Sequence, residues 1–311
     1  MKLTIALGGN ALLRSGQWGT FEQQLENAST AASQLAELIE QGYELAVTHG
    51  NGPQVGNLVI QNELSREEVA EMPLYTLVGM TQGQIGYMLQ QQLNNKLAAR
   101  NIDKTAVSLV TQSVVDKNDP LFQNPSKPIG PFFSEEEAQQ RMTAKNETWI
   151  EDSGRGWRKV VPSPIPKDIV ESEVIKNLFD NAQVVIASGG GGIPVTRENN
   201  HYQGIEAVID KDLAGSILAE IVKSDIFMIL TDVPCVAINF GQPDEKRLRN
   251  VTLEELKAYE NEGHFGQGSM APKVKAAIKF VENTGNKAII SSLDEVQNAL
   301  HDKTGTHVTI V

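Results

Sequence analysis

The sequence predicts an α/β protein with a mostly parallel central sheet and helices on both of its faces. Apolar runs of strand length alternate with segments of helical periodicity along most of the 311 residues. Three of the apolar runs end in glycine clusters, which suit sharp turns from strands into helices. Parallel strands joined by helices pack as a three-layer α/β/α sandwich with right-handed crossovers.

Seven apolar runs have the composition of buried strands. Most contain consecutive apolar residues rather than a strict alternation with polar ones, as parallel strands do when helices cover both faces. The predicted strands are Leu3–Leu7, Tyr43–Thr48, Thr105–Val115, Gln183–Ala187, Ile226–Thr231, Lys287–Ser291 and Thr306–Val311.

Six segments between these runs have helical spacing. In Phe21–Gln41, apolar side chains recur three or four positions apart, and Gly42 follows as a helix-ending residue. Gly79, Gly83 and Gly86 weaken the first half of the second segment. The predicted helices are Phe21–Gln41, Leu74–Arg100, Asp168–Asn181, Asp210–Val222, Leu253–Glu262 and Pro272–Asn283.

One segment, residues 116–166, breaks this alternation. It is rich in proline, glycine and charge, and it is too long for a structureless loop inside a compact domain. We expect a small protruding subdomain that serves as a lid. The whole chain, residues 1–311, then forms one domain, with an N-terminal lobe over about 1–182 and a C-terminal lobe over about 183–311.

Composition excludes several classes of partner. Lys and Arg number 27 against 39 Asp and Glu, so the net charge of −12 offers no general attraction for nucleic acid or an anionic membrane. No apolar run approaches the roughly 18 residues that a membrane-spanning helix needs. The lone Cys235 excludes an internal disulfide and a multi-cysteine metal site. We expect a cytoplasmic protein.

The three glycine clusters predict a phosphate-binding edge of the sheet. They are Gly8-Gly9-Asn10, Gly50-Asn51-Gly52 and Gly189-Gly190-Gly191-Gly192, each after an apolar run. Ligands of open parallel sheets bind at the carboxyl ends of the strands, where glycine loops and helix starts present backbone N–H groups to anions. Any one cluster alone could equally be only a tight turn.

Two lysines stand where a helix does not favour them. Lys211, in Asp210-Lys211-Asp212, and Lys273, after Pro272, both lie in a predicted first helical turn. The positive end of the helix dipole repels a cation there, so a bound phosphate would explain both positions. The structural alternative is a helix cap at Asp210 followed by ordinary surface charge.

Other motifs argue against common nucleotide folds. The chain lacks a Walker-type phosphate loop and the protein-kinase signatures. Gly50 to Gly56 nearly matches the dinucleotide fingerprint, but the spacing is one residue too long and the expected acidic residue is missing. His49 could be a base or a structural hydrogen-bonding residue.

An ordered set of motifs makes the chain resemble the carbamate kinases of the amino acid kinase superfamily. The motifs are A-L-G-G-N, T-H-G-N-G-P-Q-V-G, K-P-I-G-P, G-R-G-W-R-K-V-V-P-S-P, S-G-G-G-G-I-P-V, E-A-V-I-D-K-D and G-S-M-x-P-K. The resemblance implies the amino acid kinase fold, a homodimer with a continuous sheet, and reversible phosphoryl transfer between MgATP and carbamate, giving ADP and carbamoyl phosphate. It also implies a role in arginine or agmatine breakdown, running towards ATP.

The resemblance also implies roles for individual residues. Carbamate and the phosphoryl group would be held by Gly8, Gly9, Asn10, Gly50 and Asn51. The catalytic residues would be Lys127, Lys211, Asp212 and Lys273, and the nucleotide would lie near Thr231, Asp232, Met270 and Lys273. Mg²⁺ would be held mainly by the nucleotide phosphates and water rather than by a protein cage. The third cluster would shape the turn into the nucleotide half.

Two alternatives stay open at this stage. A kinase of another small acid would keep the same lysines, and a non-catalytic nucleotide or metabolite sensor would be expected to have lost one of them or Asp212. One departure from the family pattern is Pro234, where many relatives have Asp; it has no N–H to donate to a nucleotide.

Overall fold

The computed structural model describes residues 1–9, 12–14, 16–145, 147–152, 154–266 and 270–311. Its centre is an eight-stranded sheet in the order β15-β17-β16-β12-β1-β2-β9-β3. Neighbouring strands are parallel except for β16 and β17. The bounds are β1 Lys2–Leu7, β2 Glu44–His49, β3 Ala106–Ser108, β9 Val184–Ile186, β12 Ile226–Thr231, β15 Asn250–Thr252, β16 Lys287–Ser292 and β17 Thr306–Thr309.

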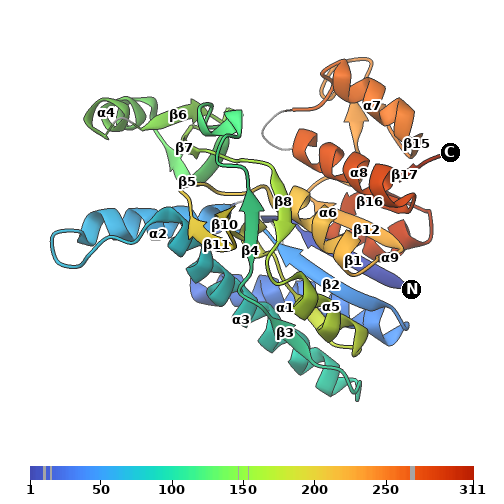
Figure 1. The fold of residues 1–311 in the computed structure, drawn as a ribbon. Coiled ribbons are helices and arrows are strands. Elements are labelled where there is room, and N and C mark those ends of the chain that lie inside the picture. Colours follow the sequence, from blue (N-terminus) through green and yellow to red (C-terminus); the bar gives the residue numbers. More distant parts are fainter. Residues whose placement is uncertain (10–11, 15, 146, 153, 267–269) are drawn as a thin grey trace.

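Helices cover both faces of this sheet, as Figure 1 shows. On one face, α1 (Phe21–Glu40) and α3 (Leu74–Ala99) pack on Leu3, Ile5 and Leu7 of β1. The other face is covered by α5 (Ser172–Asp180), α6 (Lys211–Ile221), α7 (Leu253–Asn261) and α8 (Met270–Thr284). Alternate residues of each strand enter opposite layers, so almost all of β1 is buried. The predicted three-layer α/β/α sandwich is confirmed.

Local signals place the helix ends close to their predicted positions. Thr20 caps α1 through a capping box with Gln23, and Gly42, with φ of +90°, turns the chain toward β2. Thr252 caps α7 in the same way with Glu255.

The prediction of one strand over Thr105–Val115 is wrong. The segment divides into β3 and β4 (Gln112–Val115), and β4 joins a separate sheet in the order β11-β10-β4-β8. The other strands there are β8 (Pro166–Ile169), β10 (Ile193–Glu198) and β11 (His201–Gly204). At the break, Gln82 on α3 bonds both the N–H and the carbonyl of Thr111, at 3.0 Å each, and that carbonyl also accepts from the N–H of Ile193 at 2.9 Å.

The set of predicted helices needs two changes. The predicted helix Asp168–Asn181 starts too early: Asp168 and Ile169 complete β8, and α5 begins only at Ser172. The carboxylate of Glu171 accepts hydrogen bonds from the backbone N–H and the side chain of Gln112, which holds the chain before α5. A further helix, α2 (Gly52–Ser65), is absent from the predicted set. It buries little apolar surface, so its sequence has no strong helical stripe.

The insertion forms a small sheet of its own. Its strands are β5 (Lys127–Phe133), β6 (Thr148–Glu151) and β7 (Trp157–Val161) in the order β5-β7-β6, with α4 (Glu135–Lys145) beside them. Figure 1 shows this unit projecting beside α2. The remaining short elements are η2 Pro120–Phe122, η3 Gly189–Gly191, β13 Ala237–Ile238, β14 Lys246–Arg247, η4 Leu293–Glu295 and α9 Val296–Leu300.

A glycine pair joins the insertion to the sandwich. A Cβ atom on Gly56 of α2 would lie 1.9 Å from Cα of Gly130 on β5. Gly130 has φ of +76°, which an L side chain rarely adopts. The helix and the strand therefore meet backbone to backbone, and this is possible only with glycine at both positions.

Among the described helices, none combines the length and apolar character required to cross a membrane.

Replacing Gly56 with Ala tests the docking of the insertion. The added methyl group would overlap β5, so we expect a loss of about 1–3 kcal/mol in unfolding free energy, or detachment of the insertion. Urea unfolding and limited proteolysis of residues 116–166 measure the two outcomes. The matched control is Gly83→Ala on α3, where a Cβ meets nothing within 4 Å and Ala should stabilise the helix slightly. Equal stability of both variants would contradict this packing.

Candidate active site

The first two glycine clusters meet at the carboxyl ends of adjacent parallel strands. Strand β1 lies between β2 and β12, so the residues that follow the three strands share one edge of the sheet. A Cβ on Gly8 would lie 2.7 Å from the carbonyl oxygen of Leu230 on β12. A Cβ on Gly50 would lie 3.6 Å from the backbone nitrogen of Gly9 and 3.4 Å from Cδ of Lys211. The two clusters thus adjoin each other, and Lys211 lies beside the second.

Two aspartates hold the three predicted lysines together. Asp212 pairs with Lys211 and, at 3.3 Å, with Lys273, and Asp210 pairs with Lys127 at 2.5 Å. The lysines come from the insertion, from α6 and from α8, segments far apart in the sequence. The structure therefore brings all four predicted catalytic residues into one network.

Asp210 has a second function in this network. One of its carboxylate oxygens caps α6 by accepting hydrogen bonds from the N–H groups of Asp212, at 2.9 Å, and Leu213, at 3.4 Å. The other oxygen takes Lys127. Sequence reasoning treated Asp210 only as a helix cap; the D-K-D pattern is the signal that could have included it in the site.

Burial and charge oppose each other in this network. Burial raises the pKa of Asp210, but the ammonium groups of Lys127, Lys211 and Lys273 outweigh it and hold that pKa well below its usual range. Burial lowers the pKa of Lys211, despite the nearby Asp212. Burial also lowers the pKa of Lys273, yet Asp212 and Asp210 outweigh it and raise the pKa overall. The carboxylates thus oppose the effect of burial on Lys211 and Lys273, and the resulting cluster of basic side chains suits an anionic ligand.

The third glycine cluster packs behind the second. A Cβ on Gly189 would lie 2.4 Å from Nε2 of His49, and one on Gly190 would lie 2.2 Å from Nδ2 of Asn51. Asn51 in turn donates a hydrogen bond to the hydroxyl of Thr81 at 2.9 Å. The third cluster therefore packs against the loop that follows β2. This contact comes in addition to the predicted role of the cluster in shaping the turn into the nucleotide half.

His49 lies between the second and third glycine clusters, against Gly189. Its side chain is buried, and Nδ1 lies 3.0 Å from the carbonyl oxygen of Gly50, which it can contact as a donor. Burial, together with the charge of Lys211, lowers the pKa of His49 to about 4. A neutral imidazole held by packing favours the structural role over that of a base.

The predicted nucleotide residues lie at the end of β12 and in the first turn of α8. The hydroxyl of Thr231 donates to Asp232 at 3.0 Å, and Asp232 contributes to the raised pKa of Lys273. Met270, the first residue of α8, is partly buried and packs against the core. Burial raises the pKa of the Cys235 thiol. Asn10 lies outside the described residues.

Arg158 is a further residue that sequence reasoning did not assign to the site. Its Nε donates to the carbonyl of Gly130 at 3.0 Å, and Nη1 pairs with Asp152 at 3.2 Å. Its Nη2 would lie 3.9 Å from a Cβ on Gly52, at the start of α2. The G-R-G-W-R motif is the signal that could have placed it here.

The fold is that of a phosphotransferase class, because the family model described as "Amino acid kinase family" matches residues 1–292. The carbamate kinase of Thermococcus kodakarensis is 56% identical over 99% of this chain and 98% of its own. Carbamate kinase from Giardia lamblia bound to citric acid superimposes with a TM-score of 0.94 at 46% identity, covering 99% of this chain and 98% of that one. The same enzyme bound to AMP-PNP gives a TM-score of 0.90 at 47% identity, with the same coverage.

The chain therefore belongs to the carbamate kinases, and it is an enzyme.

The buried His49 predicts a specific loss of stability in acid. Its pKa is about 4 in the folded state against 6.5 unfolded, so the unfolded chain binds the proton more tightly. The contribution of neutral His49 to the free energy of unfolding is complete above about pH 6.5 and is lost as the pH falls toward 4. At pH 5 the loss is on the order of 2 kcal/mol.

Urea unfolding at pH 7.5 and pH 5 measures this loss. His49→Gln should reduce the difference between the two pH values, whereas His201→Gln, at an exposed position of β11, should leave it unchanged. An undiminished difference in His49→Gln would show that His49 is not the group responsible.

Proposed function

We propose that the chain catalyses reversible phosphoryl transfer between ATP and carbamate, giving ADP and carbamoyl phosphate. The observation that carries the proposal is the network of Lys127, Lys211 and Lys273 around two buried aspartates, beside the glycine loops after β1 and β2. The names of the similar proteins supply the substrate, and the Giardia enzyme bound to AMP-PNP supports the nucleotide.

The geometry suits a reaction that depends on position and charge. In the ATP-forming direction, a β-phosphate oxygen of ADP bonds to phosphorus while the bond from phosphorus to the carbamate oxygen breaks, and carbamate leaves with the electron pair. Negative charge spreads over the phosphoryl oxygens during the transfer. Lysine ammonium groups and preorganised backbone N–H groups stabilise that charge.

Each residue has a proposed part in this transfer. Gly8, Gly9, Asn10, Gly50 and Asn51 hold carbamate and the moving phosphoryl group, although the N–H of Gly50 itself donates to the carbonyl of Leu7 at 3.2 Å. Lys127, Lys211 and Lys273 neutralise the phosphoryl group, and Asp212 orients two of these lysines. Thr231, Asp232, Met270 and Lys273 lie on the nucleotide side.

Mg²⁺ would enter with the nucleotide. Within the described part of the chain no group of His, Cys, Asp or Glu side chains forms a metal cage. Asp210 and Asp212 are both engaged by lysines, so they leave the ion to phosphate oxygens and water. When bound, the ion shields the charge on the phosphates.

The biological setting follows from the family resemblance. We propose that the enzyme makes ATP from carbamoyl phosphate in arginine or agmatine breakdown, in the cytoplasm, as a homodimer with a sheet continuous between subunits. We also propose that the insertion serves as a lid and that the two lobes bind the acid and the nucleotide. A kinase of another small acid is the alternative.

An ATP-forming assay tests the reaction. Purified protein is mixed with ADP, Mg²⁺ and carbamoyl phosphate, and ATP is measured against a control with ADP alone. We expect one ATP for each carbamoyl phosphate consumed. Replacing carbamoyl phosphate with acetyl phosphate tests the alternative: a preference for acetyl phosphate would favour another acid. No ATP from folded protein would contradict the proposed reaction.

Replacing Lys211 with Ala tests the charge network. Ala keeps the helix, but one cation beside Gly50 is lost, so kcat should fall by a factor on the order of 10²–10³. The matched control is Lys275→Ala on the same α8 that carries Lys273, since Lys275 is directed to Glu260 at 3.8 Å. That control should keep the original kcat, and circular dichroism should show both variants folded. Undiminished turnover in Lys211→Ala would remove this lysine from the mechanism.

A further inference from the structure

Glu63 occupies a position that its own helix disfavours. It lies in the last turn of α2, which contains no basic residue. A carboxylate there meets the negative end of the helix dipole. The side chain is nevertheless only 13% exposed. An interaction outside α2 must therefore account for its burial.

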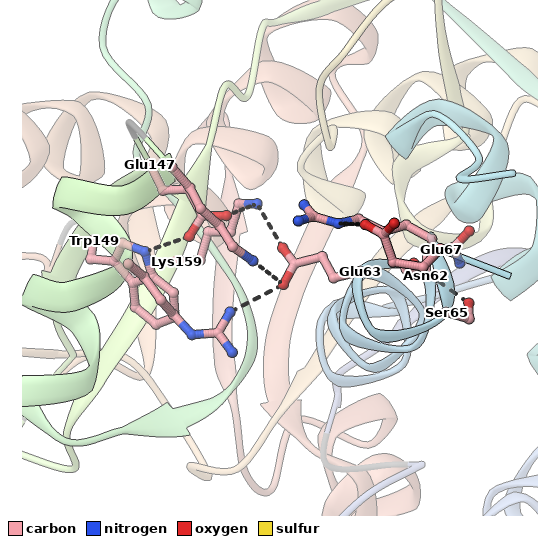
Figure 2. Close-up of polar contacts among 10 residues, drawn as sticks. Asn62, Glu63, Ser65, Glu67, Glu147, Trp149 and Lys159 are labelled. Atoms are coloured by element: carbon pink, nitrogen blue, oxygen red, sulfur yellow. Dashed lines mark hydrogen bonds and ion pairs between the residues drawn. The ribbon is translucent and has the colours of Figure 1, made fainter. Parts of the chain in front are cut away.

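That interaction comes from three cations of the insertion. Oε2 of Glu63 accepts from Lys145 Nζ at 2.7 Å and from Arg141 Nη1 at 3.2 Å, both on α4. Oε1 lies 3.9 Å from Nζ of Lys159 on β7. Figure 2 shows Glu63 extending from α2 toward the insertion, where Lys159 and Glu147 lie. One carboxylate thus ties a helix and a strand of the insertion to α2.

The cations are themselves held in place within the insertion. Lys159 also pairs with Glu147 at 2.9 Å, and Glu147 accepts a hydrogen bond from the indole of Trp149 at 2.9 Å. The guanidinium of Arg141 lies 4.8 Å from the ring centre of Phe133 and 5.7 Å from that of Trp149. Glu63 therefore meets a preorganised set of donors, unlike an ordinary surface pair between mobile side chains.

Lys159 and Lys127 lie on adjacent, hydrogen-bonded strands, so a movement of one strand affects the other. Strands β7 and β5 pair with Lys159 opposite Ile129 and with Val161 opposite Lys127. Lys127 then reaches Asp210 at 2.5 Å. A shift of β7 relative to α2 would consequently displace the lysine.

Glu63 supplies an attachment along α2 beyond the packing near Gly56, where Val55 also joins an apolar cluster with Ile129 and Val161 of the insertion. That packing includes the backbone contact between Gly56 and Gly130. Positions 56 and 63 are about 10 Å apart along a helix. The contacts near Gly56 hold one end of the insertion on α2, and the Glu63 ion pairs, about two helical turns further on, help to define its orientation.

We propose that Glu63 is a positioning residue that orients the insertion on α2 and so holds Lys127 at the Asp210 network. The inference rests on the proposed function, since that is where Lys127 acts on the phosphoryl group. It adds a residue more than 60 positions away from Lys127 to the determinants of the reaction.

The test compares Glu63→Gln with Glu67→Gln, which alters an 86% exposed carboxylate just beyond α2. The first measurement is the rate at which acetic anhydride acetylates Lys127, followed by peptide mass spectrometry without substrate. Glu63→Gln should raise that rate several-fold because the pair with Asp210 opens more often. Glu67→Gln should match the unmodified protein, and Glu63→Asp should restore part of the protection.

The second measurement is kcat/KM in the ATP-forming assay. A misplaced catalytic group should lower it about 10-fold in Glu63→Gln. In a Lys127→Ala background the same change should have little further effect, because Glu63 acts through Lys127. An equal loss in that background would show a merely structural role, and an unchanged acetylation rate would overturn the proposal. The acetylation rate of Lys127 can be measured even if carbamoyl phosphate is not a substrate. Failure of the proposed function can therefore be distinguished from failure of this proposal about Glu63.

Discussion

The site depends on two buried aspartates at the start of α6. Asp210 and Asp212 hold Lys127, Lys211 and Lys273, which arrive from three segments that are remote in sequence. Three ammonium groups could not share a partly dry site without such carboxylates, because burial and mutual repulsion would favour loss of their protons. Asp210 also anchors the helix itself, since its side chain caps α6. The fold and the charge pattern are therefore stabilised by the same contacts.

Close backbone packing is the second constraint, and it explains the distribution of glycines. Gly8 lies against β12, Gly189 and Gly190 lie against the loop after β2, and Gly56 meets Gly130 of the insertion. Only some of these glycines face the expected ligand. The others let the supporting layer approach the loop that does, so a glycine-rich motif here reports packing as well as anion binding. For this reason the third cluster has a structural part that its sequence does not reveal.

The insertion connects these two constraints. It contributes one lysine to the aspartate network and is seated on α2 by the glycine pair at one point and by the Glu63 ion pairs at another. Helix α2 starts at the second glycine cluster, so the same helix carries the loop proposed to bind the anion at one end and the Glu63 ion pairs to the insertion at the other. The orientation of the insertion and the geometry of the loop are thereby mechanically related.

The sequence by itself determined the layered α/β fold, the order of most elements and the lysines worth examining, because these depend on local periodicity, caps and turns. Phe21–Glu40 and Ile226–Thr231 needed only such signals. The division of Thr105–Val115 was decided by Gln82, and the late start of α5 was decided by the bonds from Glu171 to Gln112, both contacts between distant segments. Tertiary structure alone paired Lys127 with Asp210 and Glu63 with three cations. Ion pairs between distant segments leave no periodic trace, since their strength depends on burial and distance that only the folded chain creates.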